Sequence, residues 1–268
     1  MSFSRNFLKA KFTITGEEKM NRLVQFVGQA GPNQGNAQQG IKSSTVVFAI
    51  KYKGGVVVAG DRRTGGGYDI ISDTSVKVFK LTPFSCIACA GYCNVISFIE
   101  ENMSTVCNVF LGSYGQELST DGQAHFLKTL LESWWFFFVR NWHWTPGLPI
   151  LATYDVQLDR PRIIAFDYDG YFYEPPFFAG TGCGFDSIKG LVIDRWKSDI
   201  SEEEAINLAV RAQIHSGAGS LGVSDSRIVL PTIALIDKSG FRWVGEGIIR
   251  GHRDELIKGM EGVTCLIS

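Results

Sequence analysis

The stretch TVVFAIKYKGGVVVAG at residues 45–60 decides the fold. Its two apolar halves are rich in β-branched and aromatic residues, and Lys53-Gly54-Gly55 between them is typical of a turn, so it predicts a β-hairpin. Downstream, residues 75–80 and 84–90 predict two further strands, and Gly91 ends the second of them.

Helices and strands then alternate in groups. Helices are predicted from about residue 94, with Asn94 as a candidate cap, to 110, and from about 119 to 141, where the run at 134–138 is apolar all round and hence buried. Strands at 149–154, 162–166 and 171–174 precede helices at 185–197 and 201–214, the latter opening with a capping box at Ser201 and Glu204. Strands at 232–237 and 241–244 close the pattern. This order predicts an α+β fold, a four-layer αββα sandwich of two antiparallel sheets between helical layers.

Composition excludes several classes of protein. The chain has 268 residues, 45% hydrophobic and 20% charged, with a net charge of -1, which is typical of a globular domain. Its longest apolar run, residues 134–139, is far shorter than the roughly 18 to 20 residues of a membrane span. A net charge this close to zero supplies no positive electrostatic potential that would attract a nucleic-acid backbone. Because residues 1–19 also lack a secretory signal, we expect a soluble, cytoplasmic protein without membrane or nucleic-acid partners.

The first 44 residues differ from the rest. Six basic residues against Glu17 and Glu18 give this segment a net charge of +4, which leaves -5 for the remainder. Residues 28–40, GQAGPNQGNAQQG, are almost devoid of apolar side chains and are typical of a linker. We therefore expect residues 1–44 to form a leader that is removed, and residues 45–268 to form a single domain.

Cysteine and histidine patterns point away from metal and cofactor chemistry. Six cysteines in this length do not make a disulfide framework, so reduced thiols are expected. Cys86 and Cys89 form a CxxC pair, but residues three apart on a strand point to opposite faces of the sheet. None of the four histidines lies in a recognisable nucleophile motif, and Gly65-Gly66-Gly67 is followed by Tyr68-Asp69, which would not cradle a phosphate. No metal and no cofactor are predicted.

Four segments in a fixed register suggest a family. SSTVV at 43–47, VAGDRRT at 58–64, SVKVF at 75–79 and Ala90-Gly91 resemble the β-type subunits of the proteasome core particle, most closely the bacterial ones, which are N-terminal nucleophile hydrolases. That family separates its threonine, acid, lysine and oxyanion glycine by 16, 16 and 14 positions, and this chain reproduces the gaps. The similarity continues through residues 149–170 and 179–182.

The resemblance implies a catalytic set. Thr45 would be the nucleophile, Asp61 and Lys77 its ion pair, and Gly91 the oxyanion donor, while Thr181 stands where a serine is usual. The chemistry of the residues agrees with this assignment, because a threonine at a free N-terminus carries its own base, an α-amino group with a pKa of about 7.7 to 8.0. Cleavage between Ser44 and Thr45 would create that amine.

The resemblance also implies a substrate pocket and shows two departures from the family. The implied pocket residues are Thr64, Gly65, Ser75, Phe79, Cys89 and Cys93, none of them charged, so cleavage after neutral, mostly apolar residues is expected. Self-processing in the family usually follows a glycine, whereas Ser44 precedes Thr45 here. The family usually has an aspartate late in the chain that assists the terminal amine. No residue here clearly matches this late acid, and Ser220 is the best positional candidate, with Ser224 and Asp225 nearby.

Two functions therefore remain open, with a third less favoured. One is a threonine endopeptidase that assembles with other β-type and α-type subunits in stacked rings and degrades unfolded proteins, an ATP-driven unfoldase being left open as a further partner. The alternative is a non-catalytic, structural β-type ring subunit that retains its leader. An unrelated hydrolase or binding protein of the same fold is the third.

Overall fold

Two five-stranded antiparallel sheets form the centre of the protein. The computed structural model describes residues 45–66, 69–141 and 147–264, which all belong to the second of two units of the chain, Ile41–Ser268. The first sheet has the order β10-β1-β2-β11-β12 and the second β5-β6-β7-β8-β9. The strands are β1 (Val47–Tyr52), β2 (Gly55–Gly60), β5 (Val78–Thr82), β6 (Ser85–Gly91), β7 (Gly147–Asp155), β8 (Arg160–Phe166), β9 (Phe172–Tyr173), β10 (Phe178–Thr181), β11 (Thr232–Asp237) and β12 (Gly240–Trp243). A small hairpin, β3 (Thr64–Gly66) and β4 (Asp69–Ser72), stands apart from both.

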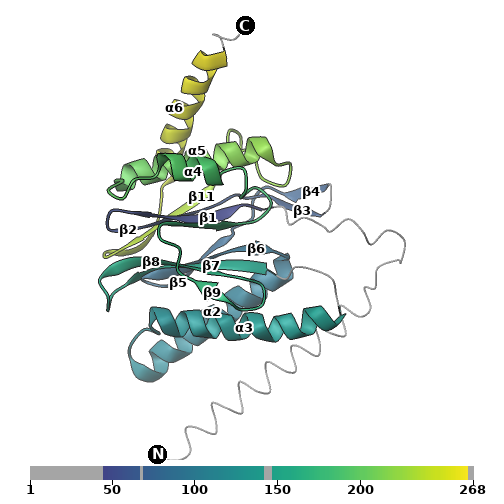
Figure 1. Ribbon diagram of the computed structural model, residues 1–268, viewed down its shortest axis with the longest axis vertical. Coiled ribbons are helices and arrows are strands. Elements are labelled where there is room, and N and C mark those ends of the chain that lie inside the picture. The colour runs from purple at the N-terminus through teal and green to yellow at the C-terminus, as the bar shows by residue number, and fades with distance from the viewer. Residues whose placement is uncertain (1–44, 67–68, 142–146, 265–268) are drawn as a thin grey trace, which may run out of the picture. The chain divides into compact units, whose positions relative to one another are not determined.

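Helices cover the outer face of each sheet, which confirms the predicted four-layer αββα sandwich (Figure 1). Helices α4 (Lys189–Arg195) and α5 (Glu202–Gly219) cover the first sheet, and α6 (Glu246–Thr264) packs against α5. Helices α2 (Cys93–Tyr114) and α3 (Thr120–Asn141) cover the second. Each sheet is therefore buried on both faces, as this architecture requires.

Alternation along β1 shows how the hairpin sequence specifies two cores. Val47 and Ala49 lie in the core between the sheets, whereas Phe48 and Ile50 lie in the core beneath α4 and α5. Successive side chains of a strand point to opposite faces, so a strand that is apolar throughout is suited to a position between two layers. The predicted hairpin is confirmed, with Val47 paired to Gly60 and Tyr52 to Gly55.

Several element boundaries differ from the prediction. Helix α2 begins at Cys93 after Tyr92, and Asn94 lies inside the helix, where its Oδ1 accepts a hydrogen bond from the Val95 N–H, so Asn94 is not the cap. The helix predicted from residue 185 is α4, which begins only at Lys189, while α5 continues beyond the predicted end to Gly219 and has the predicted capping box. Strand β10, the β3–β4 hairpin and helix α6 were not predicted. The side chains of 134–138 lie outside the described residues.

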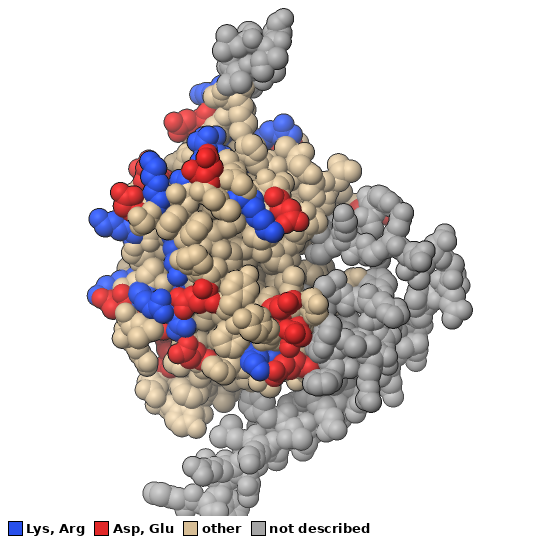
Figure 2. Space-filling view, viewed as in Figure 1, with Lys and Arg blue, Asp and Glu red and all other residues tan. Residues whose placement is uncertain are grey.

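The surface carries charges of both signs. On the face shown in Figure 2, lysine and arginine side chains are interspersed with aspartate and glutamate, and no large region has one sign. Among the described helices, none combines the length and the apolar character that crossing a bilayer would require.

Candidate active site

Asp61 is fixed where strand β2 leaves the first sheet. Its backbone N–H donates to the Val46 carbonyl at 3.1 Å, and the Val46 N–H donates back to Asp61 Oδ1 at 2.8 Å. The carboxylate is completely buried. A buried carboxylate needs donors for its lone pairs, so the hairpin register that brings Asp61 beside Val46 supplies the first of them.

Lys77 supplies the second donor. It lies just before β5, 4% exposed, and its Nζ donates to Asp61 Oδ1 at 2.6 Å and also to the Arg63 carbonyl. Burial lowers the pKa of the Lys77 ammonium, and the neighbouring Asp61 carboxylate offsets only part of this effect. Removing either partner would leave a charge buried without its counter-ion, which is costly.

Backbone groups hold the other carboxylate oxygen. Asp61 Oδ2 accepts hydrogen bonds from the Arg63 N–H at 2.9 Å and from the Ser224 N–H at 3.1 Å. Ser224 is fully buried, and its Oγ accepts from the Arg62 N–H at 3.0 Å. The sequence analysis placed Ser224 only near the missing acid; its contact spans 163 positions along the chain, and no local pattern signals it.

Thr45 is held by the segment after β10. Its carbonyl accepts hydrogen bonds from the Gly184 N–H and from Cys183 Sγ, each at 3.4 Å. Gly182 has φ +101°, and a Cβ there would lie 2.2 Å from the Thr45 carbonyl oxygen. Both facts require glycine at this position. Cys183 was not among the predicted site residues.

A cavity of about 680 Å³ joins most of the predicted site residues. Of the predicted catalytic set, Thr45, Lys77, Gly91 and Thr181 line it, and Asp61 lies behind Lys77. Of the predicted pocket residues, those that line it are Thr64, Gly65, Ser75, Phe79 and Cys93. Gly91 has φ +144°, a conformation that favours glycine. The structure thus brings together side chains from both sheets and from helix α2.

The cavity has charged walls that the sequence analysis did not identify. Arg63 and Asp186 line it in addition to Lys77. The Arg63 guanidinium forms two hydrogen bonds with Asp73, at 2.8 and 2.9 Å, which hold the pKa of the Asp73 carboxyl below its usual value. Asp186 forms an ion pair with Lys189. Each charged residue that lines the cavity is thus paired: Arg63 with Asp73, Asp186 with Lys189 and Lys77 with Asp61.

Two predicted residues lie outside the cavity lining. Cys89 is completely buried and does not line the cavity, although alternation along β6 places it on the face opposite to Cys86 and Ala88. Burial raises the pKa of both thiols, Cys86 and Cys89. Ser220 caps α5, and its Oγ lies 3.4 Å from Cys183 Sγ, so it reaches the cavity only through that thiol. Ser44 lies outside the described residues.

The described side chains offer no obvious metal site. Within residues 45–66, 69–141 and 147–264, no three histidine, cysteine, aspartate or glutamate side chains gather in a way that could hold an ion.

The αββα sandwich of two antiparallel sheets is the fold of the N-terminal nucleophile hydrolases. The family model described as proteasome subunit matches residues 41–233, so the chain belongs to the proteasome subunit family. Similar proteins include the proteasome subunit beta of Jonesia denitrificans, 29% identical over 79% of this chain and 70% of that protein. The proteasome subunit beta of Acidothermus cellulolyticus is 26% identical over 81% of this chain and 76% of that protein. The proteasome subunit beta of Streptomyces griseus subsp. griseus is 28% identical over 74% of this chain and 70% of that protein. Within the family, the chain is thus a β-type subunit of the bacterial kind.

Proposed function

We propose that this subunit is a threonine endopeptidase whose nucleophile, Thr45, is exposed when residues 1–44 are removed. One observation carries the proposal: the buried Asp61–Lys77 pair, joined at 2.6 Å, reaches the cavity that Thr45 lines. A structural protein gains little from such a pair, because well-packed apolar residues are often as stabilising as a buried ion pair. Retention of the pair beside a hydroxyl therefore favours catalysis.

The proposed reaction uses the new N-terminus as its base. The α-amine of Thr45 accepts the hydroxyl proton as Oγ attacks the scissile carbonyl, and Lys77 favours the deprotonated hydroxyl electrostatically. The Gly91 N–H stabilises the resulting oxyanion, a role worth roughly 10²- to 10³-fold in rate where such donors have been removed. The amine then returns the proton to the leaving nitrogen, and water hydrolyses the ester to release Thr45.

Assembly and substrate follow from the same proposal. As a proteasome subunit the chain assembles with other subunits of its family; we propose stacked rings of β-type and α-type subunits that enclose the cavity. Unfolded polypeptides would enter, and cleavage would follow neutral, mostly apolar residues, since Thr64, Ser75 and Phe79 line the pocket. An ATP-driven unfoldase would supply such substrates.

Intact mass of the chain from its assembled particle tests the proposal most directly. A species that begins at Thr45, together with hydrolysis of an apolar peptide substrate, is the expected result. Thr45→Ala should retain the leader and lose hydrolysis, while Thr129→Ala, an exposed threonine on α3, should match the wild type. Retention of residues 1–44 in fully assembled, folded rings would overturn the proposal.

The alternative function is a structural ring subunit, and one observation favours it. Ser220 places a hydroxyl, not a carboxylate, beside Cys183, so the usual late acid is absent at the best candidate position. Under this alternative the rings form with the leader in place and Lys77→Ala affects only stability. The same mass measurement separates the two functions.

A further inference from the structure

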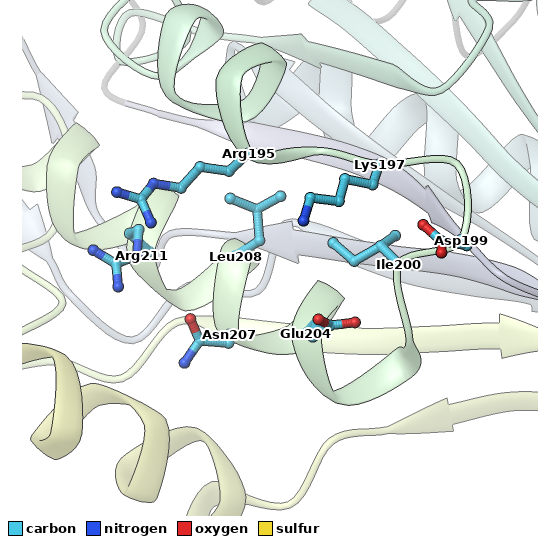
Figure 3. Close-up of a pocket in the computed structure, with 8 residues that line it drawn as sticks. All are labelled: Arg195, Lys197, Asp199, Ile200, Glu204, Asn207, Leu208 and Arg211. Carbon is cyan, nitrogen blue, oxygen red and sulfur yellow. The ribbon is translucent and has the colours of Figure 1, made fainter.

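A second cavity, of about 290 Å³, lies between the end of α4 and the first three turns of α5. It is lined by Arg195, Lys197, Asp199, Ile200, Glu204, Asn207, Leu208 and Arg211. Figure 3 shows Arg195 and Arg211 together at one end, Leu208 and Lys197 in the middle, and Asp199 at the other end beyond Ile200. None of these residues lines the cavity at Thr45.

The two arginines differ from most others in the described part of the chain, where guanidinium groups are generally paired with carboxylates. The paired ones are Arg63, Arg160, Arg162, Arg227, Arg242 and Arg253. Neither Arg195 nor Arg211 forms an ion pair or a side-chain hydrogen bond with any residue that the structure describes. Their cavity thus contains two guanidinium groups whose donors are available.

The two guanidinium groups also repel each other. Arg211 is half-buried on α5, and burial together with the nearby charge of Arg195 lowers the pKa of its guanidinium. Arg195 is exposed and Arg211 is half-buried. Both remain charged at physiological pH, so an anion held between the two groups would relieve the repulsion. Arg195, the last residue of α4, lies where a cation is favoured by the helix, which helps to hold it there.

The acidic residues of the cavity do not neutralise this end. The Glu204 carboxylate accepts hydrogen bonds from the N–H and the hydroxyl of Ser201, at 2.8 and 2.7 Å, in the capping box of α5. Asp199 lies at the opposite end of the cavity in Figure 3. The cavity therefore has a cationic end, formed by Arg195 and Arg211, and a separate acidic end, with Lys197 between them and near enough to Glu204 to help lower the pKa of that carboxyl.

We propose that the arginine end of this cavity binds a phosphate group, which Arg195 and Arg211 hold through paired N–H donors. The planar fork of a guanidinium matches two oxygens of a tetrahedral anion, and two forks match a dianion better than a single carboxylate. The proposal does not depend on whether Thr45 is a nucleophile.

Calorimetric titration of the full-length protein with inorganic phosphate, at constant ionic strength, tests the site. Saturable binding with a Kd of about a millimolar or tighter is expected for the wild type. Arg211→Gln should weaken it at least about tenfold, the scale for losing one charge-assisted pair. Arg211→Lys should retain part of the affinity, because it keeps the charge and loses the fork. A parallel titration with O-phosphoserine distinguishes a phosphate ester from free phosphate. Tighter binding of O-phosphoserine than of inorganic phosphate would indicate a phosphate ester as the ligand.

A matched control is Arg250→Gln, since Arg250 is an exposed arginine on α6 that lies outside the cavity. Its affinity for phosphate should equal that of the wild type. Two results would overturn the proposal: no saturable binding of either probe to the folded wild-type protein, or the same loss in Arg250→Gln as in Arg211→Gln, which would mean a diffuse charge effect.

Discussion

The two halves of the Thr45 site are built differently. The half around Asp61 is closed: its carboxylate has four hydrogen bonds, from Val46, Arg63, Lys77 and Ser224, and no exposure to solvent. In the half formed by Cys183 and Ser220, the Cys183 thiol lies 3.4 Å from both the Thr45 carbonyl and the Ser220 hydroxyl. The comparison teaches that the charged groups are fixed by short hydrogen bonds, whereas the thiol and the hydroxyl meet at longer distances.

The largest effect is expected when the closed half is broken. Lys77→Ala leaves the Asp61 carboxylate buried without its cation and should lower peptidase activity by about 10³-fold or more, as for other members of a catalytic unit. Maturation should stop as well, which intact mass would show. Lys80→Ala, an exposed lysine on β5, is the control. Normal maturation or normal activity in a folded Lys77→Ala particle would remove the lysine from the mechanism.

Gly182→Ala should disturb the link between the two halves. The new Cβ would meet the Thr45 carbonyl oxygen at 2.2 Å, and φ +101° is unfavourable for alanine, so a loss of about 3 kcal/mol or more in the free energy of unfolding is expected. Urea unfolding measures it. Gly190→Ala, on α4 with open space around it, should be neutral or slightly stabilising. Equal stabilities would mean that the backbone near Thr45 can move aside.

Ser220→Asp sharpens the comparison by adding an acid to the open half. If Thr45 acts through a free amine and the missing late acid limits the rate, kcat for a peptide substrate should rise by up to about tenfold, the scale of one charge-assisted hydrogen bond. Ser220→Asn has nearly the same shape without the charge and should give no increase. A fall in activity for Ser220→Asp with no change for Ser220→Asn would show that a negative charge is unwelcome there.

The smallest effect concerns the support of the closed half by Arg63 and Asp73. The pKa of Asp73 is lowered in the folded protein, so its ion pair stabilises the fold above pH 4 and this contribution disappears as the pH falls through the folded value. Asp73→Asn should therefore cost about 1 kcal/mol at pH 7, and the cost should shrink as the pH falls below the ordinary pKa of an aspartate. Unfolding curves at pH 7 and at a series of lower pH values measure this. A deficit that does not shrink as the pH falls would point to packing instead.

Periodicity and spacing predicted the layers and most of the closed half of the site. The apolar hairpin at 45–60 and the capping box at Ser201 are specified by residues close together in the sequence, and the folded structure contains both. Strand β10 and helix α6 were missed because their sequences look unfavourable: β10 is short and follows two prolines, and α6 contains several glycines. Ile249 and Leu256 nevertheless bury α6 against the core, so packing overrides propensity there.

Contacts between distant segments could not be predicted in the same way. Cys183 meets Thr45 across 138 positions, and Cys89 was assigned to the pocket by family position although its side chain is completely buried and does not line the cavity. Sequence spacing fixes which residues lie near a strand end, but the face of a sheet and the path of a long loop depend on the whole fold.

The Ser224 N–H that completes the Asp61 carboxylate has a consequence for biosynthesis. Asp61 leaves the ribosome 163 residues before Ser224, an interval of about 8 to 30 s at typical rates of translation. For most of that interval, once Lys77 has been added, the nascent chain holds the acid and its lysine but lacks one of the four donors that fix the carboxylate. The chain therefore cannot complete the closed half of its site until most of it has been translated, and a ribosome that stalls before residue 224 releases a fragment with an unfinished site.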